Sequence, residues 1–100
     1  MTRFSLFAEL KARPGKEEEV AAFLSGAQGL VAAEPGTTAW FAVRFDTHTF
    51  AVFDAFDHET GRQAHLTGRI AEALHAHSEE LFASSPVIRS ADVLADKLPA

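Results

Sequence analysis

The sequence contains no cysteine. It therefore cannot form disulfide bonds, use a thiolate nucleophile or hold zinc through thiolate ligands. It also lacks any apolar run near the roughly 20 residues that a membrane-spanning helix requires. The first residues are not typical of a secretory signal, because Glu9 and Lys11 interrupt the region that would have to be apolar. We expect a cytoplasmic protein with no membrane partner.

Positive charge is also scarce. Nine Lys and Arg stand against 14 Asp and Glu, which gives a formal net charge of −5. The basic residues are scattered along the chain, whereas binding to a nucleic-acid backbone requires a concentrated basic patch. The sequence has no phosphate-binding loop, dinucleotide-binding glycine motif or serine-nucleophile motif. Nucleic acid is therefore not expected as a partner.

Apolar residues are abundant, and 47% of the 100 residues are hydrophobic. This is enough for one hydrophobic core, so we expect a single domain over residues 1–100. Alternation with a period of two predicts strands, and helical spacing of apolar residues predicts helices. The predicted strands are residues 3–12, 37–45, 49–56 and 87–94, and the predicted helical regions are 16–33 and 57–83, the second broken near Gly68.

The order βαββαβ is that of the ferredoxin-like α+β fold, a four-stranded antiparallel sheet with its helices on one face. The central hairpin is apolar on both faces, although Asp54 stands within its second strand. Setting Phe45 opposite Phe50 places Phe41 on the face of Asp54 and Trp40 on the other face. Because helices cover only one face, the other needs a partner. We expect a homodimer joined through its sheet faces; the alternative is a monomer with an exposed apolar patch.

Four stretches carry a resemblance to a known family: "PGKEEEVAAFL", "AAEPGTTAWFAVRF", "FAVFDAF" and "QAHL". From Phe4 to about Leu94, the chain resembles the antibiotic biosynthesis monooxygenase (ABM) family. The resemblance implies a dimeric α+β barrel, with a cavity between sheet and helices in each subunit. Members include cofactor-independent monooxygenases that act on polycyclic phenols and quinols, haem-degrading enzymes and a signal-molecule isomerase.

Two polar residues match the family pattern. Asp54 stands where the third strand usually carries a Glu, and His65 is the His of the motif that opens the second helical region. Other family residues are missing. The anthrone-oxidising branch resembles a site built from Asn, Trp and Tyr, and the haem-degrading branch uses an Asn on the first strand and a Trp in the second helical region. This chain has no Asn and no Tyr, and its one Trp, Trp40, is on a strand.

Asp54 and His65 each admit two interpretations. A carboxylate on an apolar strand face requires a hydrogen bond, a cation or a raised pKa. Asp54 could therefore take a proton from a phenol, or it could be a structural carboxylate tied to a helix N-terminus or to an Arg across the dimer. His65 could act as a general base or orient a substrate oxygen, or it could hold its helix in place.

His77 lies on the apolar stripe of the last helical region, between Ala73 and Leu81, and this spacing points it toward the expected cavity. The alternative is a core histidine with its hydrogen bonds satisfied. His75 and His77 diverge on a helix, so we expect His75 to face solvent. Because no third ligand is evident, no metal site is expected.

The resemblance to the ABM family implies a cofactor-independent monooxygenase that oxidises a phenol, quinol or polycyclic aromatic. Asp54 or His65 would remove the proton and His77 would position the substrate, without a cofactor. Three aromatic residues are the candidates for contact with a planar or quinone-like ligand: Trp40, Phe41 and Phe56, of which Trp40 fits dimer packing equally well. The missing Asn and Tyr favour a non-catalytic dimer that binds a hydrophobic ligand or a protein. A haem-degrading enzyme is the third alternative.

Overall fold

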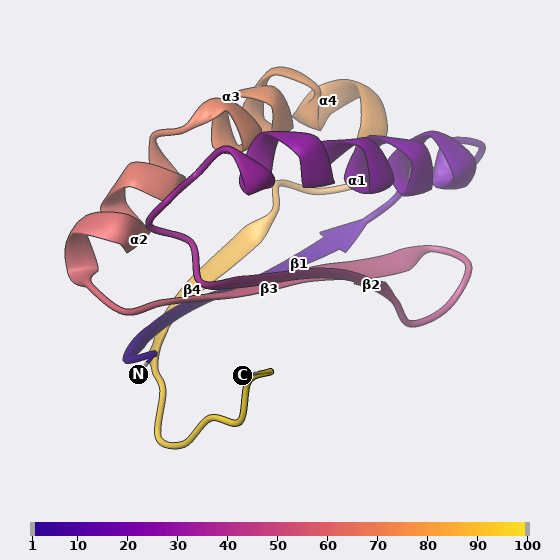
Figure 1. Cartoon of the computed structure of the whole chain (residues 1–100). Coiled ribbons are helices and arrows are strands. Elements are labelled where there is room, and N and C mark those ends of the chain that lie inside the picture. The colour runs from indigo at the N-terminus through magenta and orange to yellow at the C-terminus, as the bar shows by residue number, and fades with distance from the viewer. Residues whose placement is uncertain (1, 100) are drawn as a thin grey trace.

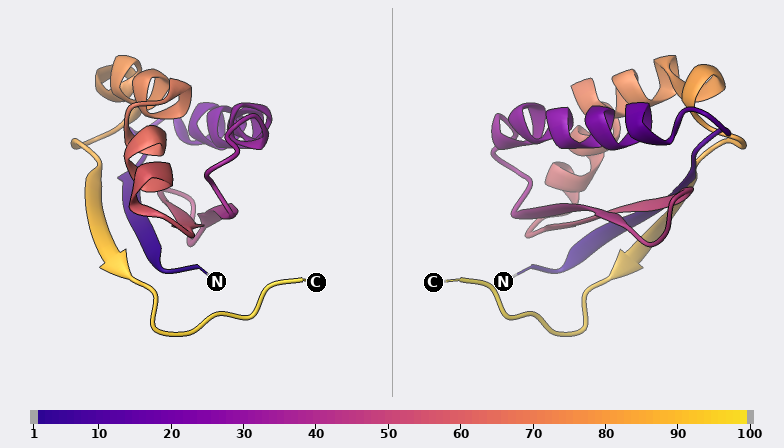
Figure 2. Two further views of the ribbon diagram at one scale, coloured as in Figure 1. Left: turned by 60° about the vertical axis from the view of Figure 1, so that its left-hand side comes forward. Right: turned by 90° about the vertical axis from the view of Figure 1, so that its right-hand side faces the viewer.

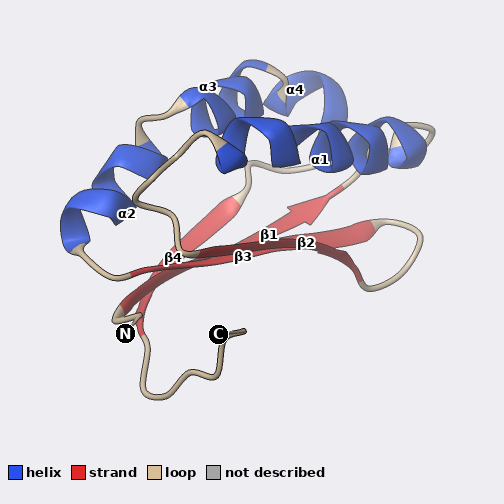
Figure 3. Cartoon of the chain, in the orientation of Figure 1, coloured by secondary structure: helices blue, strands red, loops and turns tan. Residues whose placement is uncertain are grey.

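A computed structural model describes residues 2–99, and its strands and helices follow the predicted order (Figures 1 and 3). The strands are β1 (Phe4–Lys11), β2 (Ala39–Arg44), β3 (Thr49–Phe56) and β4 (Val87–Asp92). The helices are α1 (Glu17–Ala32), α2 (Glu59–Leu66), α3 (Arg69–Ala76) and α4 (Ser78–Leu81). The second predicted helical region therefore contains two breaks, one at Gly68 as predicted and one at His77.

The strands form one antiparallel sheet in the order β2-β3-β1-β4. All four helices lie on one face of this sheet, and the other face carries no helix (Figures 1 and 2). The arrangement confirms the predicted ferredoxin-like α+β fold. We call the helix-free side the open face of the sheet.

The core lies between the sheet and the helices. Leu6, Ala8 and Leu10 alternate along β1 and are buried on the helix side. In α1 the buried residues recur at intervals of four, three and four, which is the spacing of one helix face. They are Val20, Leu24, Ala27 and Val31. This long helix and the central strand therefore form the base on which the shorter helices pack.

The register of the β2–β3 hairpin differs from the prediction by one residue. Arg44, not Phe45, is opposite Phe50, so Trp40 is opposite Asp54. A shift of one residue moves every side chain of a strand to the other face. Trp40 therefore shares the helix-facing side with Asp54, contrary to the prediction.

The hairpin loop explains the shift. The carboxylate of Asp46 accepts hydrogen bonds from the backbone N–H groups of His48 and Thr49, both at 2.9 Å. Such a side chain stabilises the turn, in which the backbone N–H of Phe45 donates a hydrogen bond to the carbonyl oxygen of Thr49 at 2.8 Å. Phe45 is therefore paired with Thr49 and not with Phe50, which shifts the register by one residue. Phe41 then lies opposite Phe53 on the open face, so the predicted placement of Phe41 beside Asp54 is wrong.

Two glycines bring the loop after α1 against α2. A Cβ atom on Gly36 would lie 2.8 Å from Cα of Gly61, and a Cβ atom on Gly61 would lie 2.6 Å from the carbonyl oxygen of Gly36. Two backbones approach this closely only where neither residue has a side chain. The contact fixes the position of the α1–β2 loop relative to α2.

After β4 the chain continues without regular secondary structure on the side of the sheet away from the helices (Figures 1 and 2). Asp96 in this tail accepts hydrogen bonds from the backbone N–H of Thr2, at 3.0 Å, and from its hydroxyl group. Within residues 2–99, no helix combines the length and the apolar character needed to cross a membrane. The cytoplasmic location stays a prediction.

The glycine contact can be tested with Gly61→Ala. Alanine normally stabilises a helix by up to about 1 kcal/mol relative to glycine. Here we expect a loss of roughly 1–3 kcal/mol in the free energy of unfolding, because the added methyl group overlaps the Gly36 backbone. Urea denaturation measures the change. Gly26→Ala in α1 is the matched control, because a Cβ atom there meets nothing within 4 Å, and it should stabilise the protein.

Candidate functional site

Asp54 is a carboxylate buried on the helix-facing side of the sheet. It lies on β3, opposite Leu6 of β1 and Trp40 of β2, and only 2% of it is exposed. A buried charge requires a partner, since removing an ion from water costs several kcal/mol. The partner is His65 of α2, whose Nε2 lies 3.0 Å from Oδ2 of Asp54.

The second ring nitrogen of His65 is also engaged. Its Nδ1 lies 2.6 Å from Oε1 of Glu34, which follows α1 in the α1–β2 loop. The imidazole therefore bridges two carboxylates from two different parts of the chain. The ring of Phe56 covers it, with ring centroids 5.5 Å apart. We call Glu34, His65 and Asp54 the carboxylate–histidine cluster.

Glu34 is held by further contacts. Its Oε1 accepts a hydrogen bond from the hydroxyl group of Thr37 at 2.8 Å. Its Oε2 lies where a Cβ atom on Gly68 would come within 2.9 Å, so the absence of a side chain at Gly68 leaves room for the carboxylate. Side-chain exposure falls along the cluster, from 20% for Glu34 to 9% for His65 and 2% for Asp54.

The cluster controls the charge of its histidine. Burial by itself lowers the pKa of His65, but the hydrogen bonds and negative charges of Asp54 and Glu34 outweigh this effect and raise the pKa above its ordinary value. The protonated ring then donates one hydrogen bond to each carboxylate. Neither nitrogen is left to accept a proton from a substrate, which argues against His65 as a general base acting directly on a ligand.

Two polar atoms near the cluster remain unpaired. Oδ1 of Asp54 and Nε1 of Trp40 are both buried, and neither has a hydrogen-bond partner among residues 2–99. The two residues are directly opposite each other on β3 and β2. The buried end of the cluster therefore keeps one free acceptor and, on the neighbouring strand, one free donor.

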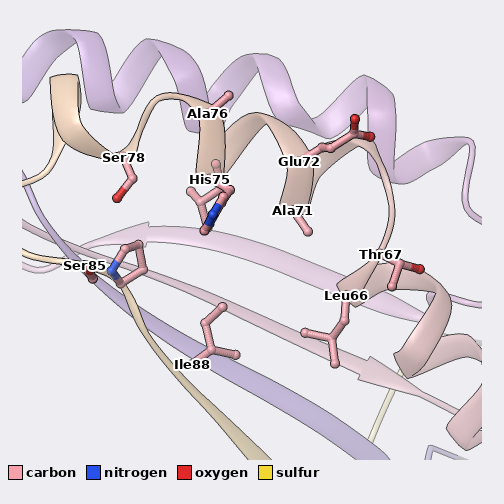
Figure 4. Close-up of a pocket in the computed structure, with 11 residues that line it drawn as sticks. Leu66, Thr67, Ala71, Glu72, His75, Ala76, Ser78, Ser85 and Ile88 are labelled. Carbon is pink, nitrogen blue, oxygen red and sulfur yellow. The ribbon is translucent and has the colours of Figure 1, made fainter.

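A separate cavity of about 560 Å³ lies between the short helices and the start of β4 (Figure 4). Its wall is largely apolar, and Leu66 and Ile88 reach into it from α2 and β4 (Figure 4). His75 of α3 points its ring from the helix toward the sheet, and Ser85 also lines the cavity (Figure 4). This combination of an apolar wall with a few polar groups is typical of a site for a small organic molecule.

The cavity and the cluster are adjacent in the chain but separate in space. Leu66 and Thr67, which line the cavity, directly follow His65, yet none of the three cluster residues lines the cavity. Glu34 instead lines a smaller hollow of about 230 Å³ beside Trp40, between the end of α1 and β2. The cluster therefore lies behind the cavity wall and not inside the cavity.

No protein-family model matches the sequence, and no curated protein is significantly similar to it. Among solved structures, the NE2512 protein of Nitrosomonas europaea, a protein of unknown function, is 54% identical in sequence, with a TM-score of 0.98. The similarity covers 100% of this chain and 97% of that protein. The chain belongs to the NE2512 family.

The fold is also similar to that of solved structures whose names refer to ABM enzymes. Two structures, each called a "putative antibiotic biosynthesis monooxygenase", come from Caulobacter crescentus and Nitrosomonas europaea. The first is 23% identical, covers 94% of this chain and 92% of its own, and has a TM-score of 0.79. The second is 13% identical, covers 92% and 99%, and has a TM-score of 0.82. These likenesses confirm the ABM-like fold.

In this member of the NE2512 family, the structure brings together part of the predicted site. Asp54 and His65 are in contact, Phe56 packs on His65, and Trp40 is opposite Asp54. Phe41 is on the open face, with 55% of it exposed. The four residues near the cluster therefore meet through tertiary structure, and Phe41 does not join them.

His77 does not point inward as predicted. Its side chain is 52% exposed, its ring packs edge-on against Phe23, and its Nδ1 lies 4.0 Å from Glu80. The physical reason is the break in the helix. Because α3 ends at Ala76 and α4 begins at Ser78, the stripe that runs through Ala73 does not continue to His77.

Two site residues were missed in the sequence. Glu34 belongs to an "EPG" segment that predicts only the end of a helix, and no local spacing connects it with His65, 31 positions later. His75 is exposed, as expected, and the sequence did not show that it also lines the cavity. Among residues 2–99, no group of three or more side chains is placed to hold a metal ion, because His65 lies between its two carboxylates and the three do not converge on a point.

The raised pKa of His65 predicts a pH-dependent stability. A group whose pKa is raised on folding stabilises the protein fully below its unfolded pKa of about 6.5, and this contribution is lost as the pH rises through the folded pKa. Wild type should therefore exceed His65→Gln by roughly 3 kcal/mol at pH 6, and by progressively less toward pH 9.

Urea denaturation of both proteins at each pH measures this difference. His77→Gln is the control, because the half-exposed ring of His77 packs on Phe23 and its electrostatic contact with Glu80 is screened by solvent. A difference between wild type and His65→Gln that stays constant from pH 6 to pH 9 contradicts the assignment.

Proposed function

We propose that the protein is a cofactor-independent monooxygenase of the ABM type, acting on an electron-rich phenol, quinol or polycyclic aromatic in the 560 Å³ cavity. The observation that supports this proposal best is the cavity itself, an apolar space between helices and sheet with an imidazole on its wall. Its volume lies within the range of about 300–1,000 Å³ that is usual for small-molecule sites. The fold shared with the proteins named as ABM monooxygenases supports it further.

His75 is the group that we propose as the base, in the place expected for His77. Histidine is the commonest general base in enzymes, and His75 lines the cavity where a phenolic hydroxyl group would lie. Leu66 and Ile88 would exclude water from the reacting carbon. The catalytic roles expected for Asp54 and His65 stay predictions, since both lie behind the cavity wall.

The proposed reaction needs O2 as its only co-substrate. His75 takes the acidic proton of an anthrone-type substrate, and the resulting anion passes one electron to O2. The two radicals combine to form a carbon–oxygen bond, and the peroxide takes back the proton from His75. Loss of water from this hydroperoxide leaves a carbonyl group, so that a CH2 group and O2 become C=O and H2O.

A non-catalytic binding protein is the second candidate. It is favoured by the engagement of both ring nitrogens of His65 and by the position of Asp54 outside the cavity. Such a protein would bind the same class of planar apolar ligand without consuming oxygen. Oxygen uptake therefore separates the two candidates.

We also propose that two copies pack through their open faces. Five large apolar side chains on and around this face are between 42% and 62% exposed: Phe41, Val43, Phe45, Phe53 and Val87. Contiguous apolar patches of this kind usually mark an interface. A second copy would supply a matching surface through a two-fold axis, and burial gains about 25 cal/mol for each Å² of apolar surface covered.

The proposed catalysis can be tested by measuring oxygen uptake with a panel of anthrones and hydroquinones. Wild type should consume oxygen, and His75→Gln should reduce kcat by about 100-fold or more, because it removes the base. Ala71→Phe should abolish uptake by filling the cavity, whereas Ala22→Phe, on the exposed side of α1, should not. Absence of uptake together with ligand binding would support the second candidate.

The proposed dimer can be tested with Phe53→Glu. A carboxylate at the centre of the open face would be buried between two sheets without a partner, so we expect single chains in light scattering at low micromolar concentration where wild type gives dimers. Ala22→Glu on α1 adds the same charge away from the face and should leave the dimer intact. A wild-type particle with the mass of one chain would contradict the proposal.

A further inference from the structure

The segment from His65 to Gly68 links the carboxylate–histidine cluster to the cavity. Glu34 is hydrogen-bonded to one end of this segment, the ring of His65, at 2.6 Å, and its Oε2 occupies the space left at the other end by the missing side chain of Gly68. The two residues between these contacts, Leu66 and Thr67, line the cavity. One carboxylate thus lies at both ends of a four-residue segment whose middle forms part of the cavity wall, and it is hydrogen-bonded to the first residue of that segment.

The side chain of Leu66 is the part of this segment that matters for a ligand. It reaches into the cavity toward Ile88 (Figure 4). The hydroxyl group of Thr67 instead bonds back to the carbonyl oxygens of Gln63 and Ala64, at 3.1 and 3.3 Å. The position of Leu66 therefore depends on where the end of α2 is held.

We infer that Glu34 is a positioning residue for the cavity: by holding the ring of His65 and lying against Gly68, it places Leu66 in the cavity wall and makes ligand binding depend on the proton carried by His65. This inference rests on the proposed function only in taking the 560 Å³ cavity as the ligand site. Glu34 itself does not line that cavity and would act through the segment 65–68.

The pH dependence of ligand binding follows from the hydrogen bonds of the two ring nitrogens of His65. With the ring protonated, both carboxylates accept a hydrogen bond from it, and the end of α2 is held from β3 and from the α1–β2 loop. When the ring loses its proton, one of the two hydrogen bonds is lost and two carboxylates face a neutral group. Leu66 is then less firmly placed, so we expect weaker ligand binding as the pH rises.

Other charged groups near His65 do not supply this effect. Asp54 from β3 and Glu34 from the loop are the two charged residues that act on the ring. On the same helix, Glu59 and Arg62 pair with each other at 2.7 Å. The residues of β1 that face α2 are apolar, Phe4 and Leu6. The pH dependence is therefore assigned to the cluster.

NMR of the ligand-free protein tests the inference directly. In wild type, the Leu66 methyl signals and their cross-peaks to Ile88 should change with pH at the midpoint of the His65 ring titration. In Glu34→Gln, this midpoint should move to lower pH by about one unit or more, since a nearby negative charge is removed. Glu34→Asp keeps the charge and should restore part of the shift.

The control is Glu80→Gln, which removes the carboxylate beside the exposed His77 and should leave the Leu66 signals unchanged. A merely structural role for Glu34 would lower the stability of Glu34→Gln without moving that midpoint. Leu66 signals that do not follow the His65 titration in wild type would overturn the inference. Because this measurement is made on wild type, it does not depend on whether a variant folds.

Binding of anthraquinone-2-sulfonate, whose charge does not change between pH 6 and pH 9, gives the second readout. At pH 7 we expect its dissociation constant to be about three- to tenfold higher for Glu34→Gln than for wild type. Dissociation constants that are equal for wild type and Glu34→Gln at every pH from 6 to 9 would contradict the inference. A wild-type protein that binds no probe would contradict the proposed ligand class, and the Leu66 titration would still decide the role of Glu34.

Discussion

Asp54 is a carboxylate placed where water does not reach it, and its burial requires a charged partner that the chain supplies from two other segments. His65 provides the cation, and Glu34 holds the far side of the ring at 2.6 Å. Breaking such a pair by removing one partner costs about 3–5 kcal/mol, because a buried charge is left uncompensated. The pairing therefore ties together β3, the start of the second helical region and the loop after α1, which are separated in sequence.

The same contact determines how the short helices are held. α2, α3 and α4 contain eight, eight and four residues, and none has a side-chain hydrogen bond at its N-cap. Helices this short are not stable alone, so their stability depends on tertiary packing. Each has one buried residue: His65 in α2, Ile70 in α3 and Leu81 in α4. In α2 this residue is polar, and its two hydrogen bonds hold the helix against the sheet. In α3 and α4 the packing of an apolar side chain has this role.

The strands and the first helix could be predicted from the sequence because their signals are local. Alternation predicts β1, a run that is apolar on both faces except for Asp54 predicts β3, and the helical spacing of apolar residues predicts α1. The hairpin register could not be predicted, because it depends on the number of residues in the turn that Asp46 stabilises. The role of Glu34 could not be predicted, because its partner His65 is 31 positions away and the contact of Gly36 with Gly61, which brings the two segments together, is not visible in the sequence. The predicted placement of His77 was wrong because a helix break at this residue ends the spacing pattern on which the prediction was based.

The separation of cluster and cavity has a physical rationale. A charged group that points into the cavity would keep water in a space that an apolar ligand needs to fill, whereas a charged group behind the wall fixes the geometry without contacting the ligand. Glu72 also lines the cavity, but its carboxylate points away from Leu66 and Ile88 (Figure 4). Most of the wall residues come from the short helices, each of which has a single buried side chain, so their stability depends on tertiary packing. A ligand that packs on Leu66 and Ile88 adds the apolar contacts that these helices lack. Binding and local stability are therefore linked through the same few residues, and the proton on His65 acts on both.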